Sequence, residues 1–271
     1  MRTQDLSKRG AVWLDALTGS APLRAGYPPS VRVADARLGD QAARFIAVLP
    51  DPNNPFPRAR GGEVGLVEAW EIARAVREVI DADTHREEKR ALVAVIDVAS
   101  QAYGRREEAY GIHQALAGAA DAYASARLAR HPVIGLIVGR AMSGAFLAHG
   151  YQANRLIALA DPRVMVHAMG KESAARVTLR SVAELEAFTE RVPPMAYDID
   201  NYASLGLLWK LLPVSNADAP TGTDQSAVEK ALKAAVDDIR ADPSRGLESR
   251  LRSEHRAASA AVRRKLREAW R

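Results

Sequence analysis

The chain alternates between short runs that are almost entirely apolar and longer segments in which apolar residues recur every three or four positions. An apolar run of about four to eight residues has the length of one strand buried on both faces of a sheet. The three- and four-residue spacing is typical of an amphipathic helix, and Leu66 to Ile80 shows it clearly. Strands that alternate with helices predict βαβ units with parallel pairing, and therefore an α/β fold. The expected strands are residues 31–33, 44–49, 91–98, 133–138, 156–160 and 164–166.

Capping and turn residues divide the rest of the chain. Ser181 and Glu184 form the pattern of a capping box that begins a helix, and Pro193-Pro194 ends it. The segment 197–212 has leucines and a tryptophan at helical spacing, so we expect a helix there. Further helices are expected over 112–130, 226–241 and 247–270. We divide the chain into an N-terminal arm (1–30), a main domain (31–223) and a basic helical extension (224–271).

Composition narrows the classes of function. The chain has no cysteine, which excludes disulfides, thiolate chemistry and cysteine-ligated metals. No apolar segment follows the first residues as in a signal peptide, and no run is long enough to span a bilayer, so we expect a cytoplasmic protein without membrane contact. Residues 245–271 carry nine basic against three acidic residues, whereas the whole chain has a net charge of +5. The basicity is therefore local, and we expect no nucleic-acid partner.

The stretch from Pro132 to Gly150 organises the chain. An apolar run is interrupted at Gly139, small residues follow at 141–145, and an apolar segment with the pattern of a helix comes next. A tight turn between a strand and a helix leaves backbone N–H groups free, and small side chains let a substrate oxygen approach them. Such amides suit a developing oxyanion, so Ser143, Gly144 and Ala145 are candidate catalytic residues.

A second turn of small residues lies after the strand expected at 91–98, and contains Ala102, Tyr103 and Gly104. If the two strands are neighbours, amides from both turns converge on one thioester or carboxylate oxygen. One such donor contributes ~2.7–4 kcal/mol of transition-state stabilisation, which suits decarboxylation of a β-carbonyl acid through an enolate. The alternative is that the small residues only permit close packing of helix against strand.

Three other functional interpretations remain open on the residues alone. Ser143 could act as a nucleophile with Asp97 and one of the histidines at 113, 149 and 167. Arg58 and Arg60 beside Gly61-Gly62 could hold an anion. The basic side chains near the C-terminus could attract an acidic protein. We find no metal-binding or dinucleotide motif and expect no metal site. The basic side chains near the C-terminus that could attract an acidic protein are Arg250, Arg252, Arg256, Arg263, Arg264, Lys265 and Arg267.

Residues from about 53 to 180 resemble the alpha-type half of the biotin-dependent carboxyltransferases, in the crotonase superfamily. Two departures fall at positions that accommodate biotin in that family. This chain has Arg140-Ala141-Met142 where the carboxyltransferases carry a more glycine-rich turn, and Lys171 where they carry proline. The resemblance rests on a proline-rich loop followed by Gly61-Gly62-Glu63, Val95-Ile96-Asp97, Ala102-Tyr103-Gly104, Arg105-Arg106-Glu107-Glu108, Pro132-Val133-Ile134, Ser143-Gly144-Ala145 and Gly170-Lys171-Glu172-Ser173-Ala174.

Taken whole, the chain is most similar to the gamma subunit of biotin-independent malonate decarboxylase, through residues 167–178 and 193–202. The resemblance implies a ClpP/crotonase-like spiral fold of repeated ββα units and a lyase active site shared with a beta subunit of similar fold. It implies a malonyl thioester carried by the phosphoribosyl-dephospho-CoA group of an acyl carrier protein, and acetyl thioester and CO2 as products. It further implies an acyl-carrier transferase alpha subunit as a partner, and no cofactor bound by this chain.

The resemblance implies roles for individual residues as well. The amides around Ser143-Gly144 and Ala102-Tyr103-Gly104 would orient the departing carboxylate or assist the enolate. Arg58, Arg140, Met142 and Lys171 are candidate substrate-binding residues, and Tyr103 is a candidate proton donor for the enolate. The alternatives are a serine hydrolase of the same superfold with Ser143 as nucleophile, and a non-catalytic scaffold that binds the carrier protein.

Overall fold

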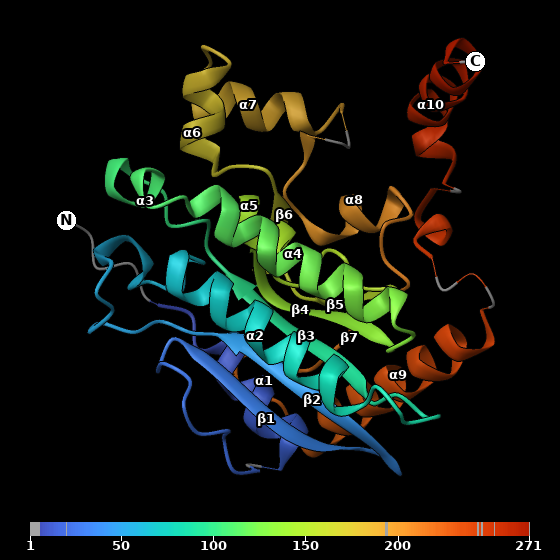
Figure 1. Cartoon of the computed structure of the whole chain (residues 1–271). Helices are drawn as coiled ribbons and strands as arrows, with labels where there is room; N and C mark the ends of the chain where they lie inside the picture. Colours follow the sequence, from blue (N-terminus) through green and yellow to red (C-terminus); the bar gives the residue numbers. More distant parts are fainter. Residues whose placement is uncertain are drawn as a thin grey trace.

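A seven-stranded sheet forms the centre of the computed structural model, which describes residues 6–19, 21–192, 195–242, 244, 246–251 and 253–270. The strand order is β1-β2-β3-β4-β5-β7, and β6 pairs with the far end of β4 (Figure 1). Only β1 runs antiparallel, as the hairpin partner of β2; every other pair is parallel, and the α/β prediction is confirmed. The strands are β1 (Val31–Leu38), β2 (Gln41–Val48), β3 (Ala91–Val98), β4 (Val133–Met142), β5 (Arg155–Ala160), β6 (Met165–His167) and β7 (Lys210–Pro213).

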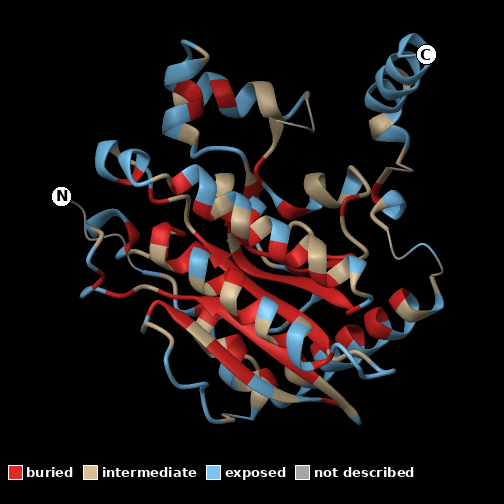
Figure 2. Ribbon diagram, viewed as in Figure 1, coloured by how far each residue is buried: buried red, intermediate tan, exposed pale blue. Residues whose placement is uncertain are grey.

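Helices cover both faces of the sheet. Helices α2 and α4 lie side by side on one face, while α1 and α9 contact the strands from the other. The strands β3 and β4 between them are almost entirely buried, because apolar helices cover them on both sides (Figure 2). The helices are α1 (Arg9–Thr18), α2 (Leu66–Ala82), α3 (Arg105–Ala109), α4 (Ile112–Leu128), α5 (Ser143–Ala148), α6 (Lys171–Val177), α7 (Val182–Thr189), α8 (Ile199–Ser204), α9 (Gly222–Ala241) and α10 (Ala257–Ala269), with 3-10 turns at Pro57–Ala59, Glu248–Leu251 and Glu254–Arg256.

The helix predicted over 197–212 is wrong in its second half. Helix α8 ends at Ser204, and Gly206 adopts a positive φ of 70° that breaks the helical path. The chain then enters β7, which pairs with β5. The leucine spacing fits one face of a helix, but the backbone hydrogen bonds that β7 forms with β5 stabilise a strand there instead. The other helix end predicted nearby, at Pro193-Pro194, lies outside the described residues; α7 itself ends at Thr189.

The hydrophobic core continues past residue 223, where we expected the main domain to end. Helix α9 begins at Gly222 with Thr221 as its cap, earlier than the predicted start at Ser226. Its buried face, which includes Leu232 and Val236, belongs to the same hydrophobic core as Trp13 of the N-terminal helix. Beyond α9 the expected long helix is replaced by two 3-10 turns followed by α10. The part of the chain that stands apart from the core therefore starts after α9.

A buried histidine ties the functional end of the sheet to its helices. His149 directly follows α5; its Nδ1 lies 3.1 Å from the Tyr123 hydroxyl of α4, and its Nε2 lies 3.1 Å from the Val95 carbonyl of β3. Because a carbonyl can only accept, Nε2 carries the proton and Nδ1 accepts from the tyrosine. Complete burial lowers the pKa of His149 from 6.5 to about 4. The imidazole is therefore neutral at pH 7.

This geometry predicts a loss of stability in mild acid. The folded protein holds His149 neutral, whereas the unfolded chain takes up a proton below pH 6.5. The free energy of unfolding that the neutral His149 contributes is fully present above pH 6.5. It is lost as the pH falls towards 4, to a limit of about 3 kcal/mol. Urea unfolding between pH 7.5 and 4.5 should show this slope, and His149→Gln should reduce it, leaving the part that comes from His131 and His167, whose pKa values burial also lowers. Replacing the exposed His113 by Gln is the control and should leave the slope unchanged.

Candidate functional site

The two predicted turns lie at the same end of the sheet. Strands β3 and β4 are parallel neighbours, and Val98 pairs with Ala141 at their carboxyl ends. The side-chain oxygen Oε1 of Gln101 accepts a hydrogen bond from the Gly144 amide at 2.6 Å, which joins one turn to the other. The two turns therefore lie next to each other, whereas the convergence of their amides on one substrate oxygen stays a prediction. Ligands bind at this end of the strands in open α/β sheets.

Strand β4 runs further than the sequence indicates. It continues through Gly139 to Met142 and passes into α5 at Ser143 without an intervening loop. Gly139 does not end the strand as expected. A glycine is required there because the Asp97 side chain packs against the backbone: a methyl group added at Gly139 would lie 2.2 Å from Oδ1 of Asp97. That oxygen accepts the Arg140 amide at 3.1 Å. Ser143 takes a positive φ of 60°, which is uncommon for a residue other than glycine and produces the sharp turn.

The predicted amide donors differ in their availability. The Ala102 amide is held by the Val64 carbonyl (2.9 Å), and the Tyr103 amide by the Gln101 carbonyl (3.1 Å). Both acceptors are backbone groups, so these two donors are committed to the fold. The Gly144 amide instead bonds to the side-chain oxygen of Gln101, and rotation of that side chain would free the amide without any change in the backbone. Of these three amides, Gly144 is the one that a substrate can reach.

An apolar hollow of about 610 Å³ opens in front of Ser143 and Gly144. Its walls come from α5, from α6 and from the segment 195–207, and Leu147 and Val177 stand exposed at its rim. Amides at the edge of an apolar cavity interact more strongly with an oxyanion once water is excluded from the cavity. We call this cavity the apolar hollow. It is lined by Ser143, Gly144, Phe146, Leu147, Tyr151, Val166, His167, Ala168, Met169, Ala174, Val177, Thr178, Met195, Ala196, Tyr202, Leu205 and Leu207.

His167 brings an imidazole ring to the apolar hollow. It stacks on Tyr197 with 3.8 Å between ring centroids, and its Nδ1 lies 2.9 Å from the Met169 carbonyl. Burial is the main cause that lowers the pKa of His167 below 6.5. The ring is therefore mainly neutral at pH 7 and adds no positive charge to the hollow.

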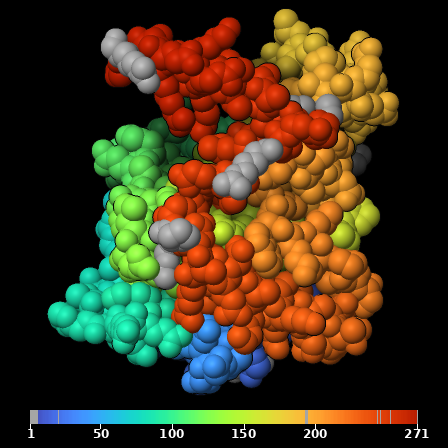
Figure 3. Space-filling view, turned by 90° about the vertical axis from the view of Figure 1, so that its right-hand side faces the viewer, coloured from blue at the N-terminus to red at the C-terminus, as the bar shows by residue number. Residues whose placement is uncertain are grey.

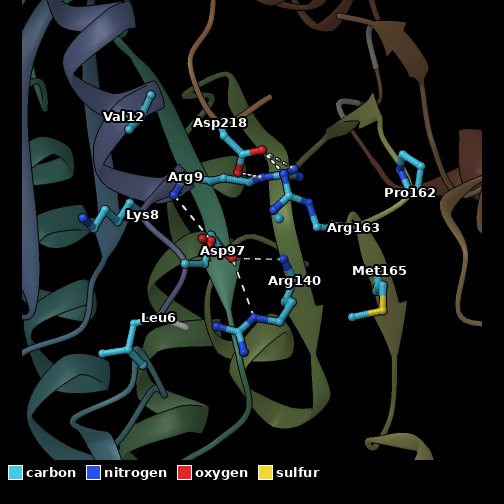
Figure 4. Close-up of a pocket in the computed structure, with 12 residues that line it drawn as sticks. Leu6, Lys8, Arg9, Val12, Asp97, Arg140, Pro162, Arg163, Met165 and Asp218 are labelled. Carbon is cyan, nitrogen blue, oxygen red and sulfur yellow. Dashed lines mark hydrogen bonds and ion pairs between the residues drawn. The ribbon is translucent and has the colours of Figure 1, made fainter. Parts of the chain in front are cut away.

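A second hollow, of about 620 Å³, is polar and lies between the N-terminal segment and the ends of β3 and β4. Figure 4 shows Arg140 and Asp97 facing each other there, with 3.9 Å between Nε and Oδ1. Arg9 is buried and pairs with Asp161 and Asp218, both at 2.9 Å. Most of the charged side chains that line this hollow are therefore paired with an opposite charge within the protein. The predicted substrate ligand Arg140 faces this polar hollow and does not line the apolar one.

The other predicted substrate-binding residues lie outside the apolar hollow. Met142 packs in a small separate cluster with residues of α6 and α7. Lys171 pairs with Glu186 at 2.7 Å. Arg58 lies against the second turn, since a methyl group at Gly104 would be 2.6 Å from its Nε. Their predicted contacts with substrate stay predictions. Tyr103, the candidate proton donor, is 57% exposed at the same turn.

The geometry does not assemble a serine triad. His149 is committed to Tyr123 and Val95, and Asp97 bonds to the Arg140 amide. In the part of the chain that the structure describes, no hydrogen bond joins Ser143 to a histidine. Within the same residues, no group of three His, Asp or Glu side chains is placed to hold a metal ion. Nor does any helix in this part have the length and apolarity needed to cross a membrane.

Sequence reasoning missed Gln101 and the walls of the apolar hollow. A polar residue among the small residues of the loop 99–104 is the available signal for Gln101. The walls come from α6 and the segment 195–207, which are distant in sequence and weakly patterned. The pairing of β6 with the end of β4, together with the bridge between Met165 and Asp198, brings them to the turn at Ser143.

Comparison with known proteins identifies relatives over most of the chain. The family model for the malonate decarboxylase gamma subunit matches residues 59–270. A malonyl-S-ACP:biotin-protein carboxyltransferase from Malonomonas rubra is 32% identical over 219 residues, which cover 79% of this chain and 75% of the relative. Among solved structures, a Pseudomonas malonate decarboxylase hetero-tetramer in complex with coenzyme A has a chain that is 65% identical, with a TM-score of 0.93 over 97% of this chain and 99% of that one.

Two further structures place the fold in context. A Pseudomonas malonate decarboxylase MdcD-MdcE hetero-dimer has a chain 62% identical, with a TM-score of 0.89 over 97% of this chain and 99% of that one. Transcarboxylase 12S is 19% identical with a TM-score of 0.65, over 87% of this chain and 42% of that one. This second likeness concerns the fold alone. It confirms the predicted crotonase-like class with a parallel sheet.

Proposed function

The chain belongs to the malonate decarboxylase gamma subunit family, and from this premise we propose that it supplies one half of a site that decarboxylates a malonyl thioester. In this proposal the malonyl group enters the apolar hollow, and one of its oxygens accepts the Gly144 amide. The hollow has the size of a small-molecule site and few polar groups, which suits a small acyl group whose carboxylate loses its hydration there.

One observation carries the proposal: the Gly144 amide already holds a carbonyl-type oxygen. The Gln101 carboxamide oxygen, 2.6 Å from the amide nitrogen, occupies the place that we assign to the substrate oxygen. The contact meets the distance and angle required of a hydrogen bond, so the N–H points at this position. A substrate oxygen can take the place of Gln101 without any movement of the backbone.

The reaction needs little beyond charge stabilisation and exclusion of water. The bond between the carboxylate carbon and the α-carbon breaks, CO2 leaves, and the electron pair moves into the thioester to form an enolate. A proton added to the α-carbon then gives the acetyl thioester. An apolar cavity removes the hydration that favours the starting carboxylate, and an aligned amide stabilises an oxygen whose charge changes during the reaction. We propose Tyr103, at the neighbouring turn, as the proton donor.

The proposal includes partners. The relative from Malonomonas rubra is named for malonyl-S-ACP, and the Pseudomonas structures are a hetero-dimer and a hetero-tetramer. We infer that this chain pairs with a beta subunit of similar fold, whose surface closes the apolar hollow. The exposed Leu147, Val177 and Leu179 at and near the rim support this inference, because such a patch is stable when covered.

In the same proposal the malonyl group arrives on the phosphoribosyl-dephospho-CoA arm of an acyl carrier protein, loaded by the acyl-carrier transferase alpha subunit. This chain then needs no cofactor of its own. The hollow is consistent with this, because its lining is almost entirely apolar. The experiment that tests the proposed function is release of CO2 from a malonyl thioester by the chain together with its beta-type partner.

Gln101 provides a specific test. Because its side chain competes with substrate for the Gly144 amide, Gln101→Ala should lower KM for a malonyl thioester about five-fold, the value of one neutral hydrogen bond of about 1 kcal/mol. The kcat should stay within two-fold, because the chemical step uses the amide alone. Steady-state kinetics of the assembled complex measures both constants, and Gln114→Ala, which changes an exposed side chain of α4, is the control. A large fall in kcat with unchanged KM would show that Gln101 takes part in the reaction and contradict the assigned role.

A further inference from the structure

Helix α10, Ala257–Ala269, stands apart from the rest of the protein. None of its residues is buried, and it projects from the side of the sheet where α9 ends (Figure 1). In the space-filling view it forms a ridge at the outer edge of the molecule (Figure 3). An isolated helix of about 12–15 residues is only marginally stable in water. The helix therefore lacks, within this chain, the packing that normally stabilises one.

The segment before α10 is firmly anchored. Arg250 is buried, and its guanidinium donates to the backbone carbonyls of Tyr151 (2.7 Å) and Ala153. The Ser253 hydroxyl donates to the Ser204 carbonyl at 2.9 Å. The base of α10 is thus held against the domain while the helix itself is presented to solvent. Such an arrangement positions a binding element without covering it.

An apolar stripe runs along α10. Val262, Leu266 and Trp270 are spaced by four residues, so they lie one above the other on the same face. Their exposed fractions are 58%, 62% and 91%, which is unusual for side chains of this size. Apolar side chains that recur every three or four residues along one face of a helix are the anchors by which a helix inserts into an apolar groove of another protein.

Positive charge borders this stripe. Arg263 and Arg267 lie along one side of the apolar face and Lys265 along the other, as the 100° step of an α-helix requires. Arg256, Arg263, Arg264 and Arg267 line a small hollow of about 120 Å³ between α10 and the turn before it. Within the described residues, none of these side chains forms an ion pair. Neighbouring guanidinium groups that are not held in ion pairs repel each other, so an acidic surface would be bound favourably.

We propose that α10 docks into an apolar groove rimmed by carboxylates on the acyl carrier protein, and so recruits the carrier to the complex. The inference rests on the proposed function, because a reaction on a carrier-borne thioester requires a carrier that docks and leaves. A second copy of this chain would bring like charges together. A bilayer would receive only three large apolar side chains, fewer than a stable interfacial helix buries. A protein surface with an apolar groove and carboxylates at its rim would bind both the apolar stripe and the arginines.

The test measures binding and chemistry separately. Full-length chain in complex with its beta-type partner is titrated with purified carrier protein by calorimetry. Arg263→Glu with Arg267→Glu should weaken binding at least 20-fold, and Leu266→Ser with Trp270→Ser at least 10-fold. The matched control, Lys210→Glu with Lys230→Glu, reverses two exposed charges elsewhere and should change binding less than two-fold. Wild-type affinity should fall steeply as the salt concentration rises from ~50 to ~300 mM, because the Debye length shortens from about 14 Å to about 6 Å.

Turnover of malonyl-N-acetylcysteamine, a small thioester without a carrier, separates this inference from the proposed function. The α10 variants should decarboxylate it at the wild-type rate. Absence of this activity in the wild-type complex would contradict the proposed function itself. Unchanged carrier affinity in both α10 variants would overturn the docking role. So would binding of α10 to phosphatidylserine vesicles in place of the carrier, or a change in the sedimentation of the variants that reveals a lost contact between copies.

Discussion

Gly144→Val is expected to lower kcat/KM for a malonyl thioester at least 100-fold in a correctly assembled complex. The added side chain begins 3.0 Å from Oε1 of Gln101 and 3.6 Å from Cδ1 of Leu116, so it fills the space in front of the amide. Loss of one aligned oxyanion donor costs ~2.7–4 kcal/mol, which is two to three orders of magnitude in rate. Gly144 does not have a positive φ, so its backbone accepts valine without strain.

Ser143→Ala is the matched variant for this prediction. It keeps every backbone amide of the turn and removes only the hydroxyl, so activity should stay within ten-fold of wild type. Size-exclusion chromatography of both variants with the partner shows that the complex has formed. An inactive Ser143→Ala complex beside an active Gly144→Val complex would favour the serine nucleophile and contradict the amide-based site.

Gly139→Ala is expected to destabilise the fold by about 3 kcal/mol, because the added methyl group collides with a buried carboxylate. It would lie 2.2 Å from Oδ1 and 2.5 Å from Cγ of Asp97. Asp97 has to move away, which breaks its bond to the Arg140 amide and its approach to the Arg140 side chain. Urea unfolding of the wild type and the variant at pH 7.5 measures the difference in the free energy of unfolding.

The control for Gly139 is another glycine whose replacement meets no neighbour. A methyl group at Gly222, the first residue of α9, has nothing within 4 Å. Gly222→Ala should leave stability unchanged or raise it slightly, since alanine is the better helix former. Equal stability of Gly139→Ala and the wild type would show that Asp97 has room to move, and that the end of β4 is less constrained than the structure indicates.

The sequence is sufficient for the parts of the fold that local pattern determines. It predicts β3 and β4 because buried parallel strands are continuous apolar runs, and α2 and α4 because their apolar residues follow helical spacing. The segment 197–212 shows the limit of this reasoning. A leucine-rich stretch fits both a helix and an edge strand, and the choice depends on β5, which lies about fifty residues earlier in the chain.

For the site, the sequence indicates where the turns meet but not which groups face the cavity. Small residues after two apolar strands predict the junctions, and the parallel pairing of β3 and β4 brings them together. Whether an amide is free depends on tertiary contacts, such as the bond from Ala102 to Val64, that no local pattern reveals. Side-chain direction is equally hidden: Arg140 and Ser143 are three residues apart, yet they line different hollows.

The central claim is that the malonyl site is shared between this chain and a beta-type partner. The most direct measurement is release of labelled CO2 from malonyl-N-acetylcysteamine by this chain alone, by the partner alone and by the two together. We predict turnover only in the mixture, because the apolar hollow is open at its rim and its amide serves a substrate held from the other side. Equal turnover by the partner alone and by the mixture would contradict the claim and place the chemistry outside this chain.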